Sequence, residues 1–414
     1  MCPVALQMDM EDPVNCTVQY MLRSIINCEE MGFNQASKAL VPGVFSLWMC
    51  SPLLELQLKS YQKPWEIWSH WKQLLKKYSH GTAHQQLRDD PVIQFQRNVF
   101  YSRHEEEKIK EGRIIELLYE EARERVIKGR YPCGSARAVA LGALQARIQL
   151  GPYDPLVHTA HFFRQRQKEF LPSHLRRRWW WPGTGGGVGV GAGGSKAGAE
   201  ARLLEQFRRA PAAAPPRKLM RKYLELCWPL PFYGAAFFQG QVEQPVRGLI
   251  SLITHQDIAV LVAINATGVY VIDECECTML LGLRYEEMSW EYARPSNEAN
   301  EDCLPCLFLQ FMVVENGLRV TKILQVFSRQ ALLMETLILH FVGEFKKRVA
   351  AEDGQRAESP QQYDYQNSPV GVEGGGDMDS PARRLANKTA RLSLATFDER
   401  GLALGHAGSW RLAY

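Results

Sequence analysis

Two closely spaced pairs of cysteines are the residues of this sequence best suited to hold a metal ion. Cys275 and Cys277 form one pair, and Cys303 and Cys306 form the other. Four thiolates in two pairs match the soft ligands that zinc prefers. However, Cys-x-Cys is not the usual spacing of a zinc knuckle, and each pair falls at the edge of an expected strand. We therefore expect small buried cysteines; a zinc or redox protein remains the alternative of another class.

A glycine-rich run contains a literal match to a dinucleotide-binding pattern. Gly189, Gly191 and Gly194 fit G-x-G-x-x-G. A dinucleotide site needs these glycines between a strand and the first turn of a helix, whereas here they stand among glycine, alanine and valine. The match is compositional, so we expect no cofactor. The sequence also has no Ser-His-Asp order with a nucleophile elbow, and we expect no enzymatic activity.

A basic stretch rich in tryptophan precedes these glycines. It reads Arg176-Arg177-Arg178-Trp179-Trp180-Trp181, and residues 176–222 hold eleven basic and two acidic residues. Basic residues beside tryptophan suit an anionic phospholipid surface, where each cation contributes about 1 kcal/mol. The alternative is a solvated loop whose charge only aids solubility. These six residues are the candidate membrane contact.

The composition limits the class of protein. The chain has 414 residues, and its 49 basic and 45 acidic residues are too balanced for a general nucleic-acid binder. A hydrophobic share of 46% excludes wholesale disorder. The sequence has neither a secretory signal nor an apolar run of about 18 residues, and its ten cysteines are too sparse for a disulfide scaffold. We expect a cytoplasmic protein of two or three domains.

The hydrophobic pattern places these candidate residues in successive blocks. Residues 1–80 combine a helix with paired strands and predict an αβ roll that lacks its first strand. Residues 91–230 begin with a strand-like segment at 92–100 and predict a helical bundle, interrupted by a disordered glycine-rich insertion at 182–216. In residues 231–349 the period changes to two. Seven strands and one amphipathic helix, 332–347, predict a barrel there, and residues 350–414 predict a disordered tail.

The order of these blocks and several phrases resemble the FERM domain family. Gly129-Arg130-Tyr131-Pro132-Cys133 is similar to the signature of the central lobe, and Leu230-Pro231-Phe232-Tyr233-Gly234 to the start of the third. Residues 94–100 and 117–122 resemble, more narrowly, the Bili-type branch. The resemblance covers about residues 4–348. It implies an α+β fold of three lobes: a ubiquitin-like roll, a helical bundle like acyl-CoA-binding protein, and a pleckstrin or phosphotyrosine-binding barrel.

The same resemblance implies a function. Members of the Bili-type branch are non-catalytic adaptors at the plasma membrane that bind the cytoplasmic tails of transmembrane proteins. The implied partners are iRhoms, which accompany a shedding metalloprotease, and the family is implicated in modulating Wnt co-receptor signalling. An endosomal cargo-sorting adaptor and a cytoskeletal linker remain alternatives.

The fifth strand of the expected barrel is the candidate peptide-binding site. In phosphotyrosine-binding folds a peptide adds as an extra strand beside the fifth strand and packs on the C-terminal helix. Counting strands places the fifth at Met288-Ser289-Trp290-Glu291-Tyr292. The helix face beside it includes Leu333, Leu337 and Phe341. Some of these apolar residues must close the barrel.

Overall fold

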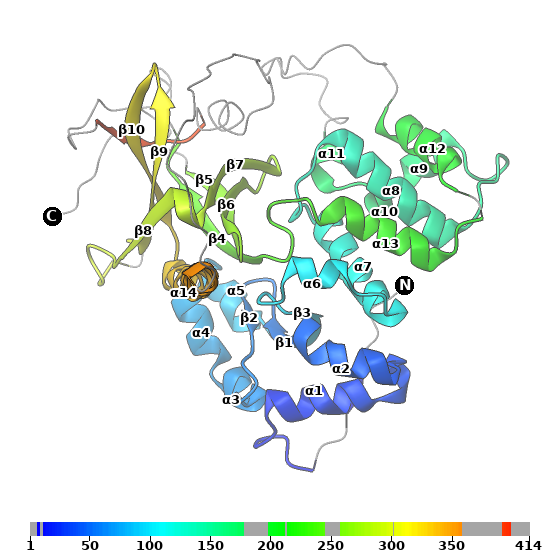
Figure 1. The fold of residues 1–414 in the computed structure, drawn as a ribbon, viewed down its shortest axis with the longest axis horizontal. Coiled ribbons are helices and arrows are strands. Elements are labelled where there is room, and N and C mark those ends of the chain that lie inside the picture. Colours follow the sequence, from blue (N-terminus) through cyan, green and yellow to red (C-terminus); the bar gives the residue numbers. More distant parts are fainter. Residues whose placement is uncertain are drawn as a thin grey trace. The chain divides into compact units, whose positions relative to one another are not determined.

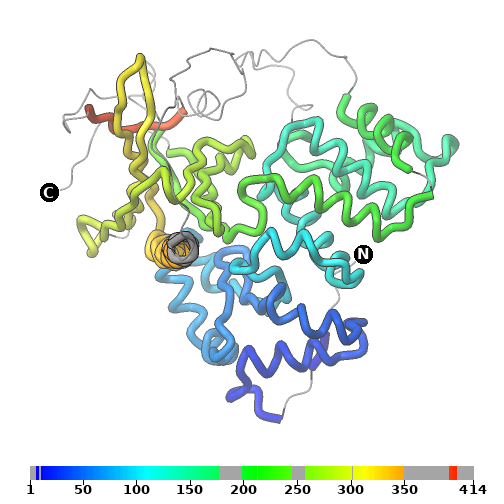
Figure 2. The backbone as a smooth tube through the Cα atoms, in the orientation of Figure 1, coloured from blue at the N-terminus to red at the C-terminus, as the bar shows by residue number. Residues whose placement is uncertain are grey.

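The computed structural model describes residues 6–8, 11–177, 198–211, 213–244, 257–300, 302–357 and 391–398. The chain forms two compact units. The N-terminal unit comprises residues 1–235 with 275–277, and the C-terminal unit comprises residues 236–274 with 278–414. The ribbon in Figure 1 and the backbone tube in Figure 2 follow the elements of each unit in chain order.

A three-stranded sheet in the order β2-β1-β3 organises the first lobe. β1 (Phe45–Cys50) is central and pairs antiparallel with β2 (Glu55–Gln57) and β3 (Val92–Arg97). The sequence places β3 at the start of the helical bundle, but it completes the sheet of the roll. Phe45 and Phe95 explain the pairing, because their rings stack with centroids 4.7 Å apart on neighbouring strands.

Short helices surround this sheet. They are α1 (Val18–Asn27), α2 (Gln35–Val44), α3 (Pro64–Ser69), α4 (Trp71–Tyr78) and α5 (Ala83–Arg88). The side chain of Thr17 accepts a hydrogen bond from the amide of Tyr20 and caps α1, as is usual for an N-cap threonine. The prediction that the roll lacks its first strand concerns the N-terminal residues. Most of residues 1–10 lie outside the described part of the chain.

The second lobe is a helical bundle, as the sequence predicts. Its helices are α6 (Arg103–Glu107), α7 (Gly112–Ile127), α8 (Ser135–Leu150), α9 (Ala160–Gln165), α10 (Gln167–Phe170), α11 (Ser173–Arg177), α12 (Ala199–Arg209) and α13 (Pro216–Cys227). α8 packs against both α12 and α13. Gly142 permits a close approach within this bundle, because a Cβ there would lie 2.5 Å from the carbonyl oxygen of Phe170.

The prediction of a disordered insertion over 182–216 is wrong for residues 199–209. These residues form α12, whose Leu203 and Phe207 are fully buried in one cluster with Phe163 and Phe170. Leu203 and Phe207 are four residues apart and therefore share one helix face. Glycine dominates the sequence of residues 183–198 but not the segment that follows. The average composition of residues 182–216 therefore predicts no core, although α12 contributes to one.

The C-terminal unit is built on a single path of strands in the order β7-β6-β5-β4-β10-β9-β8. The strands are β4 (Ala236–Val242), β5 (Ile258–Asn265), β6 (Gly268–Asp273), β7 (Thr278–Arg284), β8 (Met288–Ala293), β9 (Cys306–Glu315) and β10 (Leu318–Phe327). Asn316 and Gly317, both at positive φ, turn β9 into β10. The seven predicted strands are confirmed, and α14 (Ala331–Ala357) is the predicted helix, extended by ten residues beyond Lys347.

The prediction of disorder over 350–414 is also wrong in part. α14 continues to Ala357, and β11 (Ala395–Phe397) pairs antiparallel with β10. Leu392 and Ala395 are 4% and 6% exposed. Their burial gives this short apolar segment a packed position, which the polar composition of the tail as a whole does not suggest.

Candidate functional site

β8 is the last strand at one end of the sheet path, beyond β9. Among the strands that the structure describes, β9 is its only partner, with Trp290 opposite Leu309 and Tyr292 opposite Leu307. The outer side of an edge strand presents backbone N–H and C=O groups to which an extended peptide can add as another strand. β8, which is the fifth strand expected from the sequence, therefore lies at an edge, the position that the addition of a peptide strand requires.

The side chains of β8 alternate between two environments. Met288, Trp290 and Tyr292 are half-buried, whereas Ser289 and Glu291 are exposed. Since successive side chains of a strand point to opposite faces, the three large half-buried residues share one face. This face still offers apolar surface to a ligand.

The helix beside β8 presents a different face from the one the sequence suggests. Ala331, Met334 and Ile338 are each 0% exposed, and α14 contacts β5, β8 and β9. These residues follow the helical spacing of three and four, so they make the stripe that closes the barrel. Leu333 and Leu337 are half-buried, and they lie beside this stripe and do not belong to it.

Phe341 belongs to the closed part of the barrel. It is 4% exposed, and its ring stacks on Tyr285 with centroids 6.4 Å apart. The Tyr285 hydroxyl donates to the backbone oxygen of Asn265 at 2.6 Å, and burial raises the pKa of Tyr285. The candidate site therefore excludes Phe341 and runs to Ala293, the last residue of β8. We call Met288–Ala293 with Leu333 and Leu337 the β8–α14 surface.

The cysteine pairs lie in unlike surroundings. Cys277 and Cys306 are buried and Cys275 is exposed, and the nine cysteines within the described residues are free thiols. Burial raises the pKa of Cys306 to about 12, which keeps this thiol neutral and unreactive. Over the described ranges, no group of three or more His, Cys, Asp or Glu side chains is arranged to hold a metal ion.

The candidate membrane contact is described only at its start. Arg176 and Arg177 end α11, and Arg178, Trp179, Trp180 and Trp181 lie outside the described residues. Arg176 is half-buried, and this burial lowers its pKa.

Later arginines of the basic stretch have structural partners. Arg209 pairs with Glu205 at 2.8 Å, and Arg221 donates to the backbone oxygens of Glu107 and Ile109 at 2.7 Å each. Arg221 thus joins α13 to the end of α6 and the segment after it, whereas the Arg209 pair lies on the exposed surface of α12.

A buried ion pair that sequence reasoning missed stabilises the N-terminal unit. Arg97 donates from Nε to Glu106 at 2.6 Å, and both side chains are almost fully buried. The other oxygen of Glu106 accepts from the Trp228 indole at 2.8 Å and the Tyr233 hydroxyl at 2.5 Å. Burial acts to lower the pKa of Arg97, but the Glu106 carboxylate raises it overall. Such complete pairing lets two charges remain in a core.

No helix within the described ranges combines the length and the apolar character needed to span a membrane. Two family models match the chain. The FERM central domain matches residues 104–238, and the model described as KRIT1/FRMD8, FERM domain C-lobe, matches residues 258–337. The matched ranges correspond to the helical bundle and to the strands and helix of the C-terminal unit.

Curated relatives extend the likeness over most of the chain. Human FERM domain-containing protein 8 is 38% identical over 303 residues, which are 71% of this chain and 63% of the relative. The zebrafish (Danio rerio) protein of that name is 36% identical over 326 residues, covering 76% of this chain and 67% of its own. The chain thus spans a little under two thirds of the human relative's length.

A solved structure shows the same fold at low identity. The human myosin 7b C-terminal MyTH4-FERM domain, in complex with the harmonin-a PDZ3 domain, covers 80% of this chain and 56% of its own, with a TM-score of 0.50 and 15% identity. This likeness concerns the fold alone and agrees with the predicted α+β FERM architecture. The curated relatives and the two family models establish that the chain belongs to the FERM family and, within it, to the group of FERM domain-containing protein 8.

Proposed function

We propose that this FERM adaptor-type protein is non-catalytic and binds cytoplasmic tails of transmembrane proteins at the cytoplasmic face of the plasma membrane. Kinship with FERM domain-containing protein 8 supports an iRhom tail as the partner, with stabilisation of a sheddase complex at the cell surface as the consequence. Modulation of Wnt co-receptor signalling belongs to the same proposal. Binding takes place on the β8–α14 surface.

The observation that carries this proposal is the outer side of β8, with which none of the described strands pairs. A tail segment in extended conformation adds beside Met288–Ala293 and gains backbone hydrogen bonds whatever its sequence. Alternate side chains of the tail then pack on Trp290 and Tyr292 and reach toward Leu333 and Leu337. Half-buried aromatic residues of this kind supply much of the binding energy at protein interfaces.

A binding assay with the purified full chain and the N-terminal cytoplasmic segment of an iRhom tests the site. Trp290→Ala combined with Tyr292→Asp should weaken binding at least tenfold, and Leu337→Glu should do the same from the helix side. Leu339→Asp is the matched control, because Leu339 is 56% exposed on another side of α14. Unchanged affinity in folded β8 and α14 variants would exclude this surface. Tails from endosomal cargo or cytoskeletal partners, tested in parallel, separate the alternative adaptors.

The proposal includes an anionic phospholipid as a second partner of residues 176–181. Sedimentation with phosphoinositide vesicles tests it by comparing the full chain with a chain that lacks residues 179–197. This deletion spares α12, whose buried Leu203 and Phe207 belong to the bundle core. Loss of sedimentation in the deleted chain supports a membrane contact, whereas equal sedimentation of both chains rejects it.

A further inference from the structure

One edge of β10 pairs with another described strand of the barrel over only a small part of its length. β10 pairs with β9 along its whole length, from Leu318 to Phe327. On its other side it pairs with β4 only at Phe327, opposite Gln241. β11 lies along the remaining edge, where Thr321, Lys322 and Ile323 face Phe397, Thr396 and Ala395 (Figure 1). A distant segment of the chain thus adds as a strand to the part of the β10 edge that the other described strands leave unpaired.

The segment Arg391–Asp398 is anchored by more than strand pairing. The Arg391 guanidinium lies 2.6 Å from the carboxylate of Asp273, whose side chain is 2% exposed at the end of β6. Leu392 and Ala395 are buried, and the amide of Ser393 donates to the backbone oxygen of Glu243 at 3.4 Å. One cation, two apolar side chains and a strand are the elements by which protein modules recognise extended peptides.

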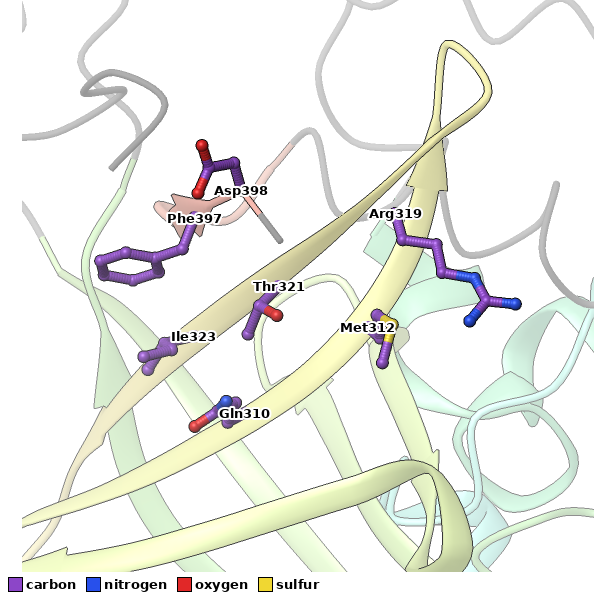
Figure 3. A pocket seen from close by; sticks show the side chains of 7 residues that line it. All are labelled: Gln310, Met312, Arg319, Thr321, Ile323, Phe397 and Asp398. Carbon is purple, nitrogen blue, oxygen red and sulfur yellow. The ribbon is translucent and has the colours of Figure 1, made fainter. Parts of the chain in front are cut away.

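A pocket of about 620 Å³ opens beside this segment. The tail forms one wall through Phe397 and Asp398, and β9 and β10 form the other, with Met312 and Thr321 among the lining residues (Figure 3). Met312, Thr321 and Phe397 stand opposite one another on three adjacent strands. Met312 nevertheless remains 62% exposed, so the pocket has apolar surface that the segment does not cover.

The contact is small for a permanent interface. The described segment, Arg391–Asp398, has eight residues, and its contacts include three pairs of strand residues, one ion pair, one backbone hydrogen bond and two buried apolar side chains. A stable interface engages roughly 20–30 residues on each side. Residues 358–390 connect the segment covalently to α14, and such a tether raises the local concentration of its end. The occupancy of the β10 edge therefore depends on the tether, and a segment supplied by another chain can compete.

We propose that the β10 edge is a second peptide-binding site, separate from the β8–α14 surface, and that Arg391–Asp398 is its internal occupant. The competing ligand is an extended segment of a partner protein with the same chemistry. It carries an arginine for Asp273, a leucine directly after it, a small residue four positions after the arginine, and an aromatic residue six positions after it. Binding of that ligand displaces the tail from the edge.

The test uses the full chain and a fluorescent peptide of residues 388–400. Ala395→Glu places a charge at a buried position of the tail and releases the internal strand, so the labelled peptide should bind this variant at least tenfold more tightly than the original chain. Ala350→Glu is the matched control, because it makes the same change at an exposed position of α14. It should bind the peptide as the original chain does. Equal affinity of the peptide for the original and Ala395→Glu chains would overturn the proposal.

Three further measurements make the result independent of folding and of the β8–α14 surface. Excess peptide added to the unaltered chain should increase amide hydrogen exchange within residues 395–397, and unchanged exchange would contradict displacement. A peptide with Arg391→Ala should bind the Ala395→Glu chain at least tenfold more weakly. Binding should persist when Trp290→Ala and Tyr292→Asp are added; its loss there would assign the peptide to the β8–α14 surface and reject a second site.

Discussion

Glu55 shows how a single carboxylate can join two lobes of the N-terminal unit. It lies on β2 and accepts a hydrogen bond from Arg130 at 2.6 Å, while a nitrogen of Arg125 on α7 lies 3.4 Å away. Burial acts to raise the pKa of Glu55. The charges and hydrogen bonds of both arginines outweigh burial and lower this pKa below the ordinary value of a glutamate. The ionised form is thus favoured by folding.

The lowered pKa of Glu55 predicts a defined loss of stability in acid. A carboxylate whose folded pKa is depressed stabilises the protein fully above its unfolded pKa, and this contribution disappears as pH falls through the folded value. Glu55→Gln should cost about 1–3 kcal/mol at pH 7, and this deficit should shrink as the pH falls from 5 to 3. Urea unfolding of both proteins across that range measures the difference. Glu124→Gln, in an exposed pair with Lys128, is the control, and a deficit from Glu55→Gln that does not change with pH would contradict the role of Glu55.

At the scale of elements, the local hydrophobic pattern was sufficient to predict strands wherever strands that follow one another in the sequence also pair in the sheet. β8 alternates between exposed and half-buried side chains and β6 is a short apolar run, both of which are local strand signals. Consecutive strands such as β5, β6 and β7 pair with each other. The position of β8 at the edge then followed from counting strands in a resembling fold. β3 was misplaced because its partner β1 lies more than forty residues earlier, and no local pattern records that pairing.

Two short ordered elements, α12 and β11, lie in segments whose average composition predicts disorder. α12 follows a glycine run and β11 lies in a polar tail, so the average composition of each window conceals one apolar turn or strand. The spacing of Leu203 and Phe207 does indicate a helix, in conflict with the composition, and the apolar residues from Leu392 to Phe397 could have indicated a strand. The Glu106 cluster had no such signal, since its partners Trp228 and Tyr233 are 122 and 127 residues away.

Phe207→Ala tests whether α12 is part of the bundle core. The ring is 0% exposed, lies 5.5 Å from the ring of Phe163 and is covered by the Arg147 guanidinium at 4.8 Å. Removing it should lower the free energy of unfolding by about 3–5 kcal/mol. Arg209→Ala, at a side chain 68% exposed, should change it by less than about 1 kcal/mol. Denaturant unfolding compares the two variants. A Phe207→Ala protein as stable as the parent would show that α12 is not part of the bundle core.

For the whole molecule, the division into two compact units implies two separate cores. The N-terminal unit depends on buried groups such as Arg97 and Glu106, and the C-terminal unit depends on strand residues such as Val262, which is 0% exposed. Units with their own cores generally unfold as separate cooperative transitions. A ligand that binds one of them stabilises that transition by mass action, so the unit that binds a tail can be identified without a structure of the complex.

Hydrogen exchange measured through a urea titration should therefore resolve two transitions. Arg97→Ala leaves Glu106 buried without its cation, which should cost about 3–5 kcal/mol and move only the transition of residues 1–235. Val262→Ala should move only the other transition, by roughly 1–3 kcal/mol. Saturating tail peptide should raise the transition of the C-terminal unit alone, because the β8–α14 surface belongs wholly to that unit. If Arg97→Ala lowered both transitions equally, the two units would unfold as one, and a ligand-induced shift could no longer be assigned to either.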